Sequence, residues 1–368
     1  MGFNAMFDPN CWAAVPFHFW SVVFFALGSI VGSFLNVCIY RMPLDLSVVS
    51  PPSHCPHCKY AIPFYLNVPL LTWLSLRGRC KNCAAPISPR YFIVELLTGV
   101  LFLGCWLTFG HTSPLLALVY ALFLAGLVVA TFIDFEHFII PDEITIGGAV
   151  AGFVISFFLP QLHGTTSVGQ GMARSLLGIV VGGGVVYGVL RLGKLLFGRQ
   201  KIKLPTETTI VFSETALCLP GQEIPYEELF CRKTDTILFQ ARTVELVDRG
   251  YCDVAVRLSS NALKIGDEEI APETVLHMEA VCSEIILPRE AMGQGDVKFM
   301  AAIGAFTGWQ GTLFSLMASS IIGSAVGIVL ILMRRREWSS KMPYGPYIAM
   351  AAVIWVFAGT KILALIFP

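Results

Sequence analysis

Charged residues are scarce in this sequence. Only 14% of its 368 residues are Asp, Glu, Lys or Arg, and the formal net charge at pH 7 is zero. Hydrophobic residues make up 55% of the chain, and its mean hydropathy is +0.70. Because a basic excess is the usual footprint of a nucleic-acid partner, we expect none here. The composition predicts a polytopic α-helical membrane protein that lies in a lipid bilayer.

Basic residues are also missing ahead of the first apolar run, residues 17–39, since no Lys or Arg precedes Arg41. A cleaved signal peptide begins with a positively charged region, so this run is predicted to remain as the first transmembrane span. The run after Asp296 is short for a span and predicts a broken or tilted helix. Together the apolar runs predict about eight transmembrane helices, the others at residues 91–109, 115–133, 144–159, 172–197, 297–308, 312–333 and 347–367.

The loops between these runs differ in basic residues. Six Lys or Arg lie within residues 41–90, whereas residues 111–114, 161–170 and 309–311 hold none. The positive-inside rule therefore places the first loop in the cytoplasm. The same side receives Arg334, Arg335, Arg336 and Lys341, and the topology puts Asp134 and Asp296 at the cytoplasmic face.

An aspartate stands at the polar end of two apolar runs. Asp134 closes one run, and Asp296, in Gly293-Gln294-Gly295-Asp296, opens another. Two acids in a poorly solvated site do not both ionise, so one can serve as a general base for water and the other as a general acid. Gly293 and Gly295 are expected to take a positive φ and to present Asp296 to a bound peptide. From these residues alone, helix capping is an equally good interpretation.

The first loop carries two Cys-x-x-Cys motifs, Cys55 with Cys58 and Cys80 with Cys83, separated by 21 residues. This spacing is typical of a four-thiolate zinc site. In a reducing cytoplasm a metal is favoured over two disulfides. We expect a structural Zn²⁺, because four Cys ligands leave no open position for a catalytic water.

A polar stretch of about ninety residues, 201–287, interrupts the apolar pattern, and residues 201–290 hold 16 acidic against 9 basic side chains. Residues 208–212, 236–247 and 253–258 have strand composition. Residues 212–230 also align without gaps on residues 258–276, at an offset of 46. The prediction is a small, β-rich α+β domain with an internal repeat. Its cysteines have no metal spacing and are expected to be reduced thiols: Cys218, Cys231, Cys252 and Cys282.

Several motifs, in this order, resemble the type IV prepilin peptidases, which are aspartic proteases of the GxGD type. The resemblance covers nearly everything outside residues 201–287 and is carried by Gly32–Arg41, by Leu76-Arg77-Gly78-Arg79-Cys80 leading into the second cysteine pair, by Val94–Gly99, by Ile133-Asp134 with Pro141-Asp142, by Glu290–Lys298 and by Gly304–Trp309. The long stretch between the fifth apolar run and Asp296 departs from the family, in which that connection is short.

The resemblance implies an endopeptidase that removes the short basic leader from prepilins or pseudopilins at the cytoplasmic face of the bacterial inner membrane. It also implies that the new N-terminus is methylated from S-adenosylmethionine, and that pilus or type II secretion assembly components are partners. The implied catalytic pair is Asp134 and Asp296, whereas residue chemistry alone does not choose between Asp134 and Asp142.

Other acids near the pair have open roles. Glu136, Asp142 and Glu143 either dock the basic leader or form a solvated acidic loop, and Asp142, after Pro141, is expected to cap the next helix. Glu95 is either a site residue or a side chain that reaches out to the interface.

Two alternative functions remain open from the sequence. One alternative is a peptidase without methyl transfer, and the other is a proton-coupled transporter or assembly scaffold whose intramembrane acids carry protons. The predicted organisation of the chain has five parts: a first span (residues 1–40), a cytoplasmic zinc loop (41–90), spans two to five (91–200), the inserted domain (201–288) and the GxGD motif with the last spans (289–368).

Overall fold

The computed structural model divides into two compact units. One comprises Met1–Val186 with Gln294–Pro368 and is helical, and the other, Tyr187–Gly293, contains a β-sheet. The residues that the structure describes are 16–63, 66–197, 199–220, 222–230, 235–275, 277–288, 293–333 and 342–366. Predictions that involve Cys231, Arg289, Glu290 and the basic residues 334–336 and 341 lie outside them.

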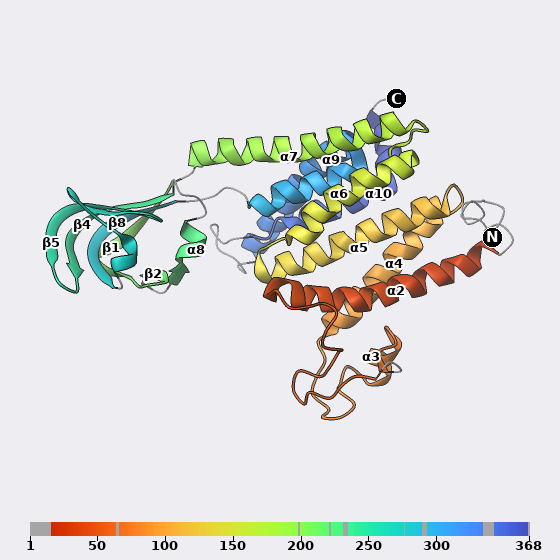
Figure 1. The fold of residues 1–368 in the computed structure, drawn as a ribbon, viewed down its shortest axis with the longest axis horizontal. Coiled ribbons are helices and arrows are strands. Elements are labelled where there is room, and N and C mark those ends of the chain that lie inside the picture. The colour runs from red at the N-terminus through yellow and green to blue at the C-terminus, as the bar shows by residue number, and fades with distance from the viewer. Residues whose placement is uncertain are drawn as a thin grey trace. The chain divides into compact units, whose positions relative to one another are not determined.

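Long apolar helices form the first unit (Figure 1), as expected for a polytopic membrane protein. Six helices within the described ranges are long and apolar enough to cross a membrane. They are α2 (Phe17–Arg41), α4 (Pro89–Phe109), α5 (Pro114–His137), α7 (Val168–Phe197), α9 (Gln294–Leu332) and α10 (Gly345–Ile366), and the shorter α6 (Asp142–Phe158) lies among them.

The eight predicted apolar runs thus correspond to seven helices in the described part of the chain, of which α6 is the shortest. Its 17 residues extend about 26 Å at the usual rise, slightly less than the hydrocarbon core of a bilayer. The runs predicted separately at 297–308 and 312–333 belong to α9, which is interrupted at Gly308. That residue has φ 69° and ψ 177°, a conformation outside the helical region.

The two halves of α9 run in opposite directions. In the first half, Lys298 contacts Asp142 at the start of α6, and Ala305 lies beside Gly152 further along it. In the second half, Gly311 lies beside Trp355 while Gly323 lies beside Tyr347, so this half runs antiparallel to α10. The break at Gly308 therefore returns the chain toward the end at which Asp296 lies, and the two halves of α9 correspond to the two predicted runs.

Close backbone contacts hold α9 against α7. A Cβ atom built on Gly178 would lie 2.0 Å from the carbonyl oxygen of Gly304, and one on Gly182 would lie 2.4 Å from that of Met300. Small residues at such crossings let helix backbones approach within a lipid environment, where packing rather than the hydrophobic effect drives association. This contact fixes the helix that begins beside Asp296.

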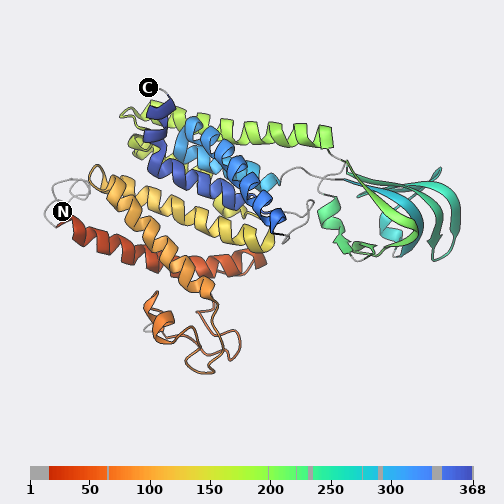
Figure 2. The same ribbon diagram turned by 180° about the vertical axis from the view of Figure 1, so that it is seen from behind.

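The second unit is an eight-stranded antiparallel sheet with the order β3-β2-β1-β8-β4-β5-β6-β7, shown also from behind in Figure 2. A short helix, α8 (Tyr226–Leu229), follows β3. The β-rich insert expected from the sequence is present. Its strands are β1 (Arg199–Phe212), β2 (Ala216–Leu219), β3 (Gln222–Pro225), β4 (Thr236–Leu246), β5 (Gly250–Ser259), β6 (Leu263–Ile265), β7 (Glu268–Ile270) and β8 (Met278–Pro288).

Two segments of the sheet repeat the same local structure. Ser213 Oγ donates to the carbonyl of Ala216 at 2.9 Å and accepts from its N–H at 3.0 Å. Ser259 makes the same two bonds to Ala262, at 2.9 and 3.0 Å and at an offset of 46 residues. In each case a strand, this serine turn, two short strands and a helical turn follow one another. The buried core of the sheet includes Ile210, Leu217, Ile237, Leu263 and Ile285.

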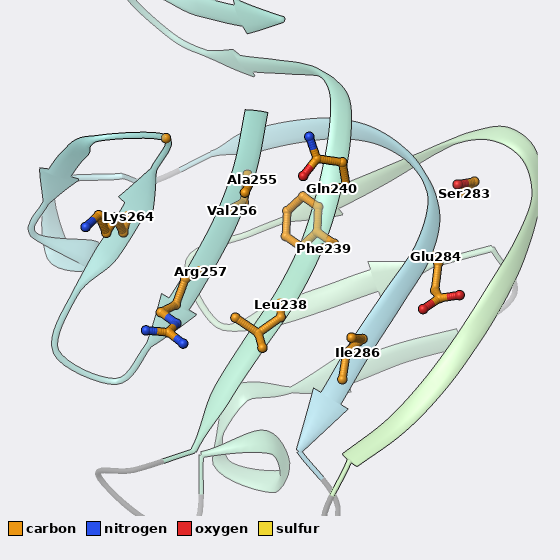
Figure 3. A pocket seen from close by; sticks show the side chains of 11 residues that line it. Leu238, Phe239, Gln240, Ala255, Val256, Arg257, Lys264, Ser283, Glu284 and Ile286 are labelled. Atoms are coloured by element: carbon orange, nitrogen blue, oxygen red, sulfur yellow. The ribbon is translucent and has the colours of Figure 1, made fainter. Parts of the chain in front are cut away.

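One hollow of the sheet unit lies over β4, β5, β6 and β8 and has a volume of about 650 Å³ (Figure 3). Leu238 and Ile286 give it an apolar floor, and Arg257 and Lys264 bring two cations to its border. Glu284, which also lines it, pairs with Lys201 at 3.2 Å. The hollow is therefore partly apolar and partly charged.

The crossing of α7 and α9 makes a prediction about stability. Gly178→Ala should lower the free energy of unfolding by about 1–3 kcal/mol, because the added methyl group overlaps the backbone at Gly304. Gly184→Ala on the same helix is the control, since nothing lies within 4 Å of its added Cβ. Thermal unfolding of the purified proteins in detergent compares the two. Equal stability of both variants would contradict the packing described here.

Candidate active site and metal site

Asp134 lies in the last turn of α5, where the helix stops because Phe138 takes a left-handed conformation with φ 55°. The N–H of Phe138 donates to the carbonyl of Asp134 at 3.1 Å and closes the turn. The Asp134 side chain is 6% exposed. Its Oδ2 accepts a hydrogen bond of 2.9 Å from the backbone N–H of Gly345, the first residue of α10.

Asp296 is the third residue of α9 and is 8% exposed. A carboxylate in the first turn of a helix is favoured by the unpaired N–H groups of that turn. The preceding Gly295 has a helical backbone, so the expected positive φ at this position is wrong. Because Gly295 has no side chain, its backbone lies close to Ile140, where a Cβ on Gly295 would be 3.5 Å away. Gly293 is exposed just before the helix.

The ends of three helices meet around Ile140, a buried residue between α5 and α6. Gly295 approaches Ile140 from α9, and a Cβ on Gly345 of α10 would lie 3.2 Å from its Cδ1. A Cβ on the same glycine would lie 2.7 Å from Asp134 Oδ2. Two motifs that are far apart in sequence thus place their aspartates, both buried, at helix ends that share the same neighbour.

The acids beside Asp134 are engaged in ion pairs. Glu136 Oε1 pairs with Arg90 Nη1, and Asp142 accepts from Lys298 Nζ at 2.6 and 2.9 Å. The expectation that Asp142 caps α6 is wrong, because Pro141 occupies the N-cap position and Asp142 is the first helical residue. Glu143 is exposed, and no ion pair to it is found among the described residues.

The four cysteines of the first loop converge. Cys55 Sγ lies 3.8 Å from Cys83 Sγ, Cys58 Sγ lies 3.9 Å from Cys80 Sγ, and all four sulfurs are within 4.8 Å of one another. Four thiolates around Zn²⁺ at about 2.3 Å in tetrahedral geometry place their sulfurs about 3.8 Å apart. The observed separations therefore fit a zinc ion. His54 and His57 are exposed and lie outside this set of four.

The two cysteine motifs are folded alike. The N–H of Cys55 donates to the carbonyl of Tyr60 at 3.0 Å, and Cys80 makes the same bond to Ala85 at 2.9 Å. The residue after the second cysteine of each motif, Lys59 or Ala84, has a positive φ of 56° or 58°. The repeated turn directs backbone N–H groups toward the sulfurs. Hydrogen bonds from the backbone of Tyr60 and the side chain of Asn82 lower the pKa of the Cys58 thiol, whereas burial and the neighbouring cysteines raise the pKa of Cys83.

Glu95 links the cysteine loop to the helices. It is 8% exposed, so the expectation that it reaches out to the interface is wrong. Its Oε2 accepts a hydrogen bond of 2.7 Å from the N–H of Leu70, which has φ 61° and precedes the short helix α3 (Leu71–Ser75). In α3, Trp73 packs against Phe92 of α4 with ring centroids 5.1 Å apart. The segment between the cysteine pairs therefore rests on α4.

Comparison with known proteins agrees with this arrangement. Residues 26–109 match the bacterial peptidase A24 N-terminal domain, and residues 121–206 and 273–328 match the type IV leader peptidase family. A prepilin leader peptidase/N-methyltransferase of Aeromonas hydrophila is 30% identical over 374 residues, which cover 95% of this chain and 93% of that protein. The chain belongs to the type IV leader peptidase family.

Other members of the type IV leader peptidase family extend the comparison. The prepilin leader peptidase/N-methyltransferase of Myxococcus xanthus (strain DK1622) is 51% identical over 138 residues, 37% of this chain and 40% of that protein. The one from Stutzerimonas stutzeri is 25% identical over 361 residues, 92% of this chain and 90% of that protein. No solved structure matches the chain. The family match omits residues 207–272, most of the sheet, and ends at residue 328, before α10.

The sequence motifs led to both aspartates and all four cysteines, but not to Gly345. Gly345 contributes a backbone N–H, and its lack of a side chain leaves room for Asp134. A search for chemically active side chains detects neither feature. The partner of Glu95 was missed for the same reason, because it is the backbone of Leu70, 25 residues away in sequence.

The cysteine cluster predicts a metal requirement. Purified protein should contain one Zn²⁺ per chain, and Cys55→Ser or Cys80→Ser should release it and destabilise the loop, since structural zinc contributes folding free energy directly. Cys105→Ser, at a buried cysteine outside the cluster, is the control and should keep the metal. Elemental analysis decides the matter, and zinc-free wild-type protein would exclude the site.

Proposed function

We propose that this chain cleaves the leader from type IV prepilins and N-methylates the new N-terminus of the product. The membership in the type IV leader peptidase family supports this function, as do relatives named prepilin leader peptidase/N-methyltransferase that align over 92% or more of the chain. The observation that carries the proposal is the pair of buried aspartates at helix ends gathered around Ile140.

In the proposed reaction Asp134 and Asp296 act as an aspartic protease pair. Two carboxylates that are 6% and 8% exposed are poorly solvated, and sharing one proton avoids the cost of ionising both. The ionised acid takes a proton from water, and the protonated one polarises the scissile carbonyl. The amine leaving group then takes a proton, which completes hydrolysis of the peptide bond.

The acid best suited to meeting a basic leader is Glu143. It is exposed in the first turn of α6, whereas Glu136 and Asp142 already pair with Arg90 and Lys298. Exposed ion pairs contribute only about 0–1 kcal/mol, so a basic leader can exchange with Arg90 or Lys298 at little cost. We therefore keep Glu136, Asp142 and Glu143, with Gly293 and Gly295, as proposed substrate contacts.

The proposed zinc ion is structural and would be held by Cys55, Cys58, Cys80 and Cys83. It would fix the loop that Glu95 and Trp73 attach to α4, and four thiolates leave it no position for substrate. S-adenosylmethionine is proposed as the methyl donor for the α-amine of the cleaved pilin, and we assign none of the described residues to it.

We propose that the acids, the cysteine loop and the sheet unit all face the cytoplasm from the bacterial inner membrane. The argument is the distribution of basic residues, since the loop at 41–90 holds six Lys or Arg and the loops at 111–114 and 161–170 hold none. The sheet unit follows α7 and precedes α9, whose first turn carries Asp296. Prepilins, pseudopilins and assembly components of pili or type II secretion are the proposed partners.

The proposed pair predicts loss of activity from either aspartate. Asp134→Asn and Asp296→Asn should each abolish prepilin cleavage, because either change removes one member of the proton-sharing pair. Asp142→Asn is the matched comparison and should keep kcat while raising KM, since Asp142 is a proposed substrate contact outside the proton-sharing pair. Cleavage of a purified prepilin is followed on a gel. Near wild-type cleavage by Asp134→Asn or Asp296→Asn would refute the assignment.

The sheet unit predicts a tolerated deletion. Replacing residues 203–286 with a short Gly/Ser linker should preserve cleavage at close to the wild-type rate while changing substrate choice or membrane assembly. The cut ends lie on neighbouring strands, because Ile202 pairs with Ile285 and Gln200 pairs with Leu287, so a short linker spans them. Surface insertions of this kind cost little thermodynamically. If the deletion variant folds, binds zinc and yet has no peptidase activity, the sheet unit belongs to the catalytic machinery.

A further inference from the structure

The first backbone N–H of α10 donates a hydrogen bond to Asp134. Gly345 donates to Asp134 Oδ2 at 2.9 Å, and the bond is buried. An N–H donated to a carboxylate stabilises the ionised form, and such charge-assisted bonds are stronger than neutral ones. The next residue, Pro346, has no N–H to offer. Gly345 is therefore the donor that the start of α10 presents to α5.

The absence of a side chain at Gly345 is required by the same contact. A Cβ there would lie 2.7 Å from Oδ2 of Asp134, closer than real Cβ atoms approach such a neighbour, and a tight 3.2 Å from its Cγ. A methyl group would have to push the carboxylate away from the N–H. Glycine thus gives Asp134 both a hydrogen-bond donor and the space to reach it.

The turn before α10 is held in place from α9. The hydroxyl of Tyr344 lies 2.9 Å from Ser319 Oγ and 2.9 Å from Ser320 Oγ, both in the second half of α9. Because α9 also carries Asp296, the same helix positions one acid directly and the donor to the other through Tyr344. The family match ends at residue 328, so it includes Ser319 and Ser320 but not Tyr344.

Among the described residues, the cations on the elements packed around the end of α5 have other partners than Asp134. Arg90 of α4 pairs with Glu136 and Lys298 of α9 pairs with Asp142, while Glu95 of α4 accepts from Leu70. Arg41 of α2 donates to two backbone carbonyls, those of Ser47 and Pro51. His137 is exposed at the end of α5, and Asp296 is the partner acid.

We propose that Gly345 is a positioning residue for Asp134, because its N–H fixes and stabilises the ionised carboxylate and its missing side chain leaves the space for that contact. This inference rests on the proposed peptidase function and adds a residue that acts through one acid of the pair. Because the two acids share one proton, this donor sets how readily Asp134 takes a proton or gives one up.

Gly345→Ala tests the inference through the pH profile. Losing the N–H bond disfavours ionised Asp134, so one limb of kcat/KM for prepilin cleavage should move up by about one to two pH units. The acidic limb moves if Asp134 is the base and the basic limb moves if it is the acid, and KM should stay nearly unchanged. Tyr344→Phe removes only the hydroxyl that bonds to Ser319 and Ser320, and it should shift the limb in the same direction by a smaller amount.

Gly323→Ala is the control, because its added Cβ meets the ring of Tyr347 at 3.4 Å, an ordinary contact, and it should keep the wild-type profile. Zinc content shows that each variant is folded. If Gly345→Ala does not fold, Tyr344→Phe decides alone. If neither limb moves, or if a limb moves down, in the deciding variant, the inference is overturned. If Asp134→Asn is inactive in the same assay, only this inference fails, whereas an active Asp134→Asn refutes the proposed pair itself.

Discussion

The cost of keeping two carboxylates out of water governs this structure. Asp134 and Asp296 are both nearly inaccessible, and each stands at a helix end where backbone groups compensate for lost solvent. The third helix end, at Gly345, supplies an N–H, and Ile140 fills the space between them. Around them, α9 folds back at Gly308 and packs on α10, and α7 and α9 touch through glycines. Each of these contacts fixes a helix that begins or ends at the acids.

The cysteine loop is tied to the same framework at a different place. Glu95 is buried in α4 and accepts the N–H of Leu70, and Trp73 packs against Phe92. The cysteines and the aspartates are thus attached to one helical unit, which fits a protein proposed to perform two reactions on one chain end. The sheet is a separate compact unit, and the family match passes over most of it.

Side-chain chemistry made much of this predictable from sequence. The aspartates beside apolar runs, the two Cys-x-x-Cys motifs and the alternating composition of residues 208–212 each indicate a structure through residue type and spacing. Three contributions escaped because they depend on backbone or context. Two of them are hydrogen bonds from main-chain N–H groups, that of Gly345 to Asp134 and that of Leu70 to Glu95. The third is the N-cap position of α6, which was expected for Asp142 and is occupied by Pro141. The short run 297–308 predicted a broken or tilted helix, and the break lies at Gly308, although the positive φ of that glycine does not itself appear in hydropathy.

The central claim is that one chain cleaves a prepilin and methylates the product. The most direct measurement is the mass of the product N-terminus after purified protein is incubated with a prepilin and labelled S-adenosylmethionine. The account predicts a pilin that lacks its leader and carries one labelled methyl group on its α-amine. An uncleaved prepilin would contradict the peptidase assignment, and a cleaved but unlabelled pilin would contradict the second activity.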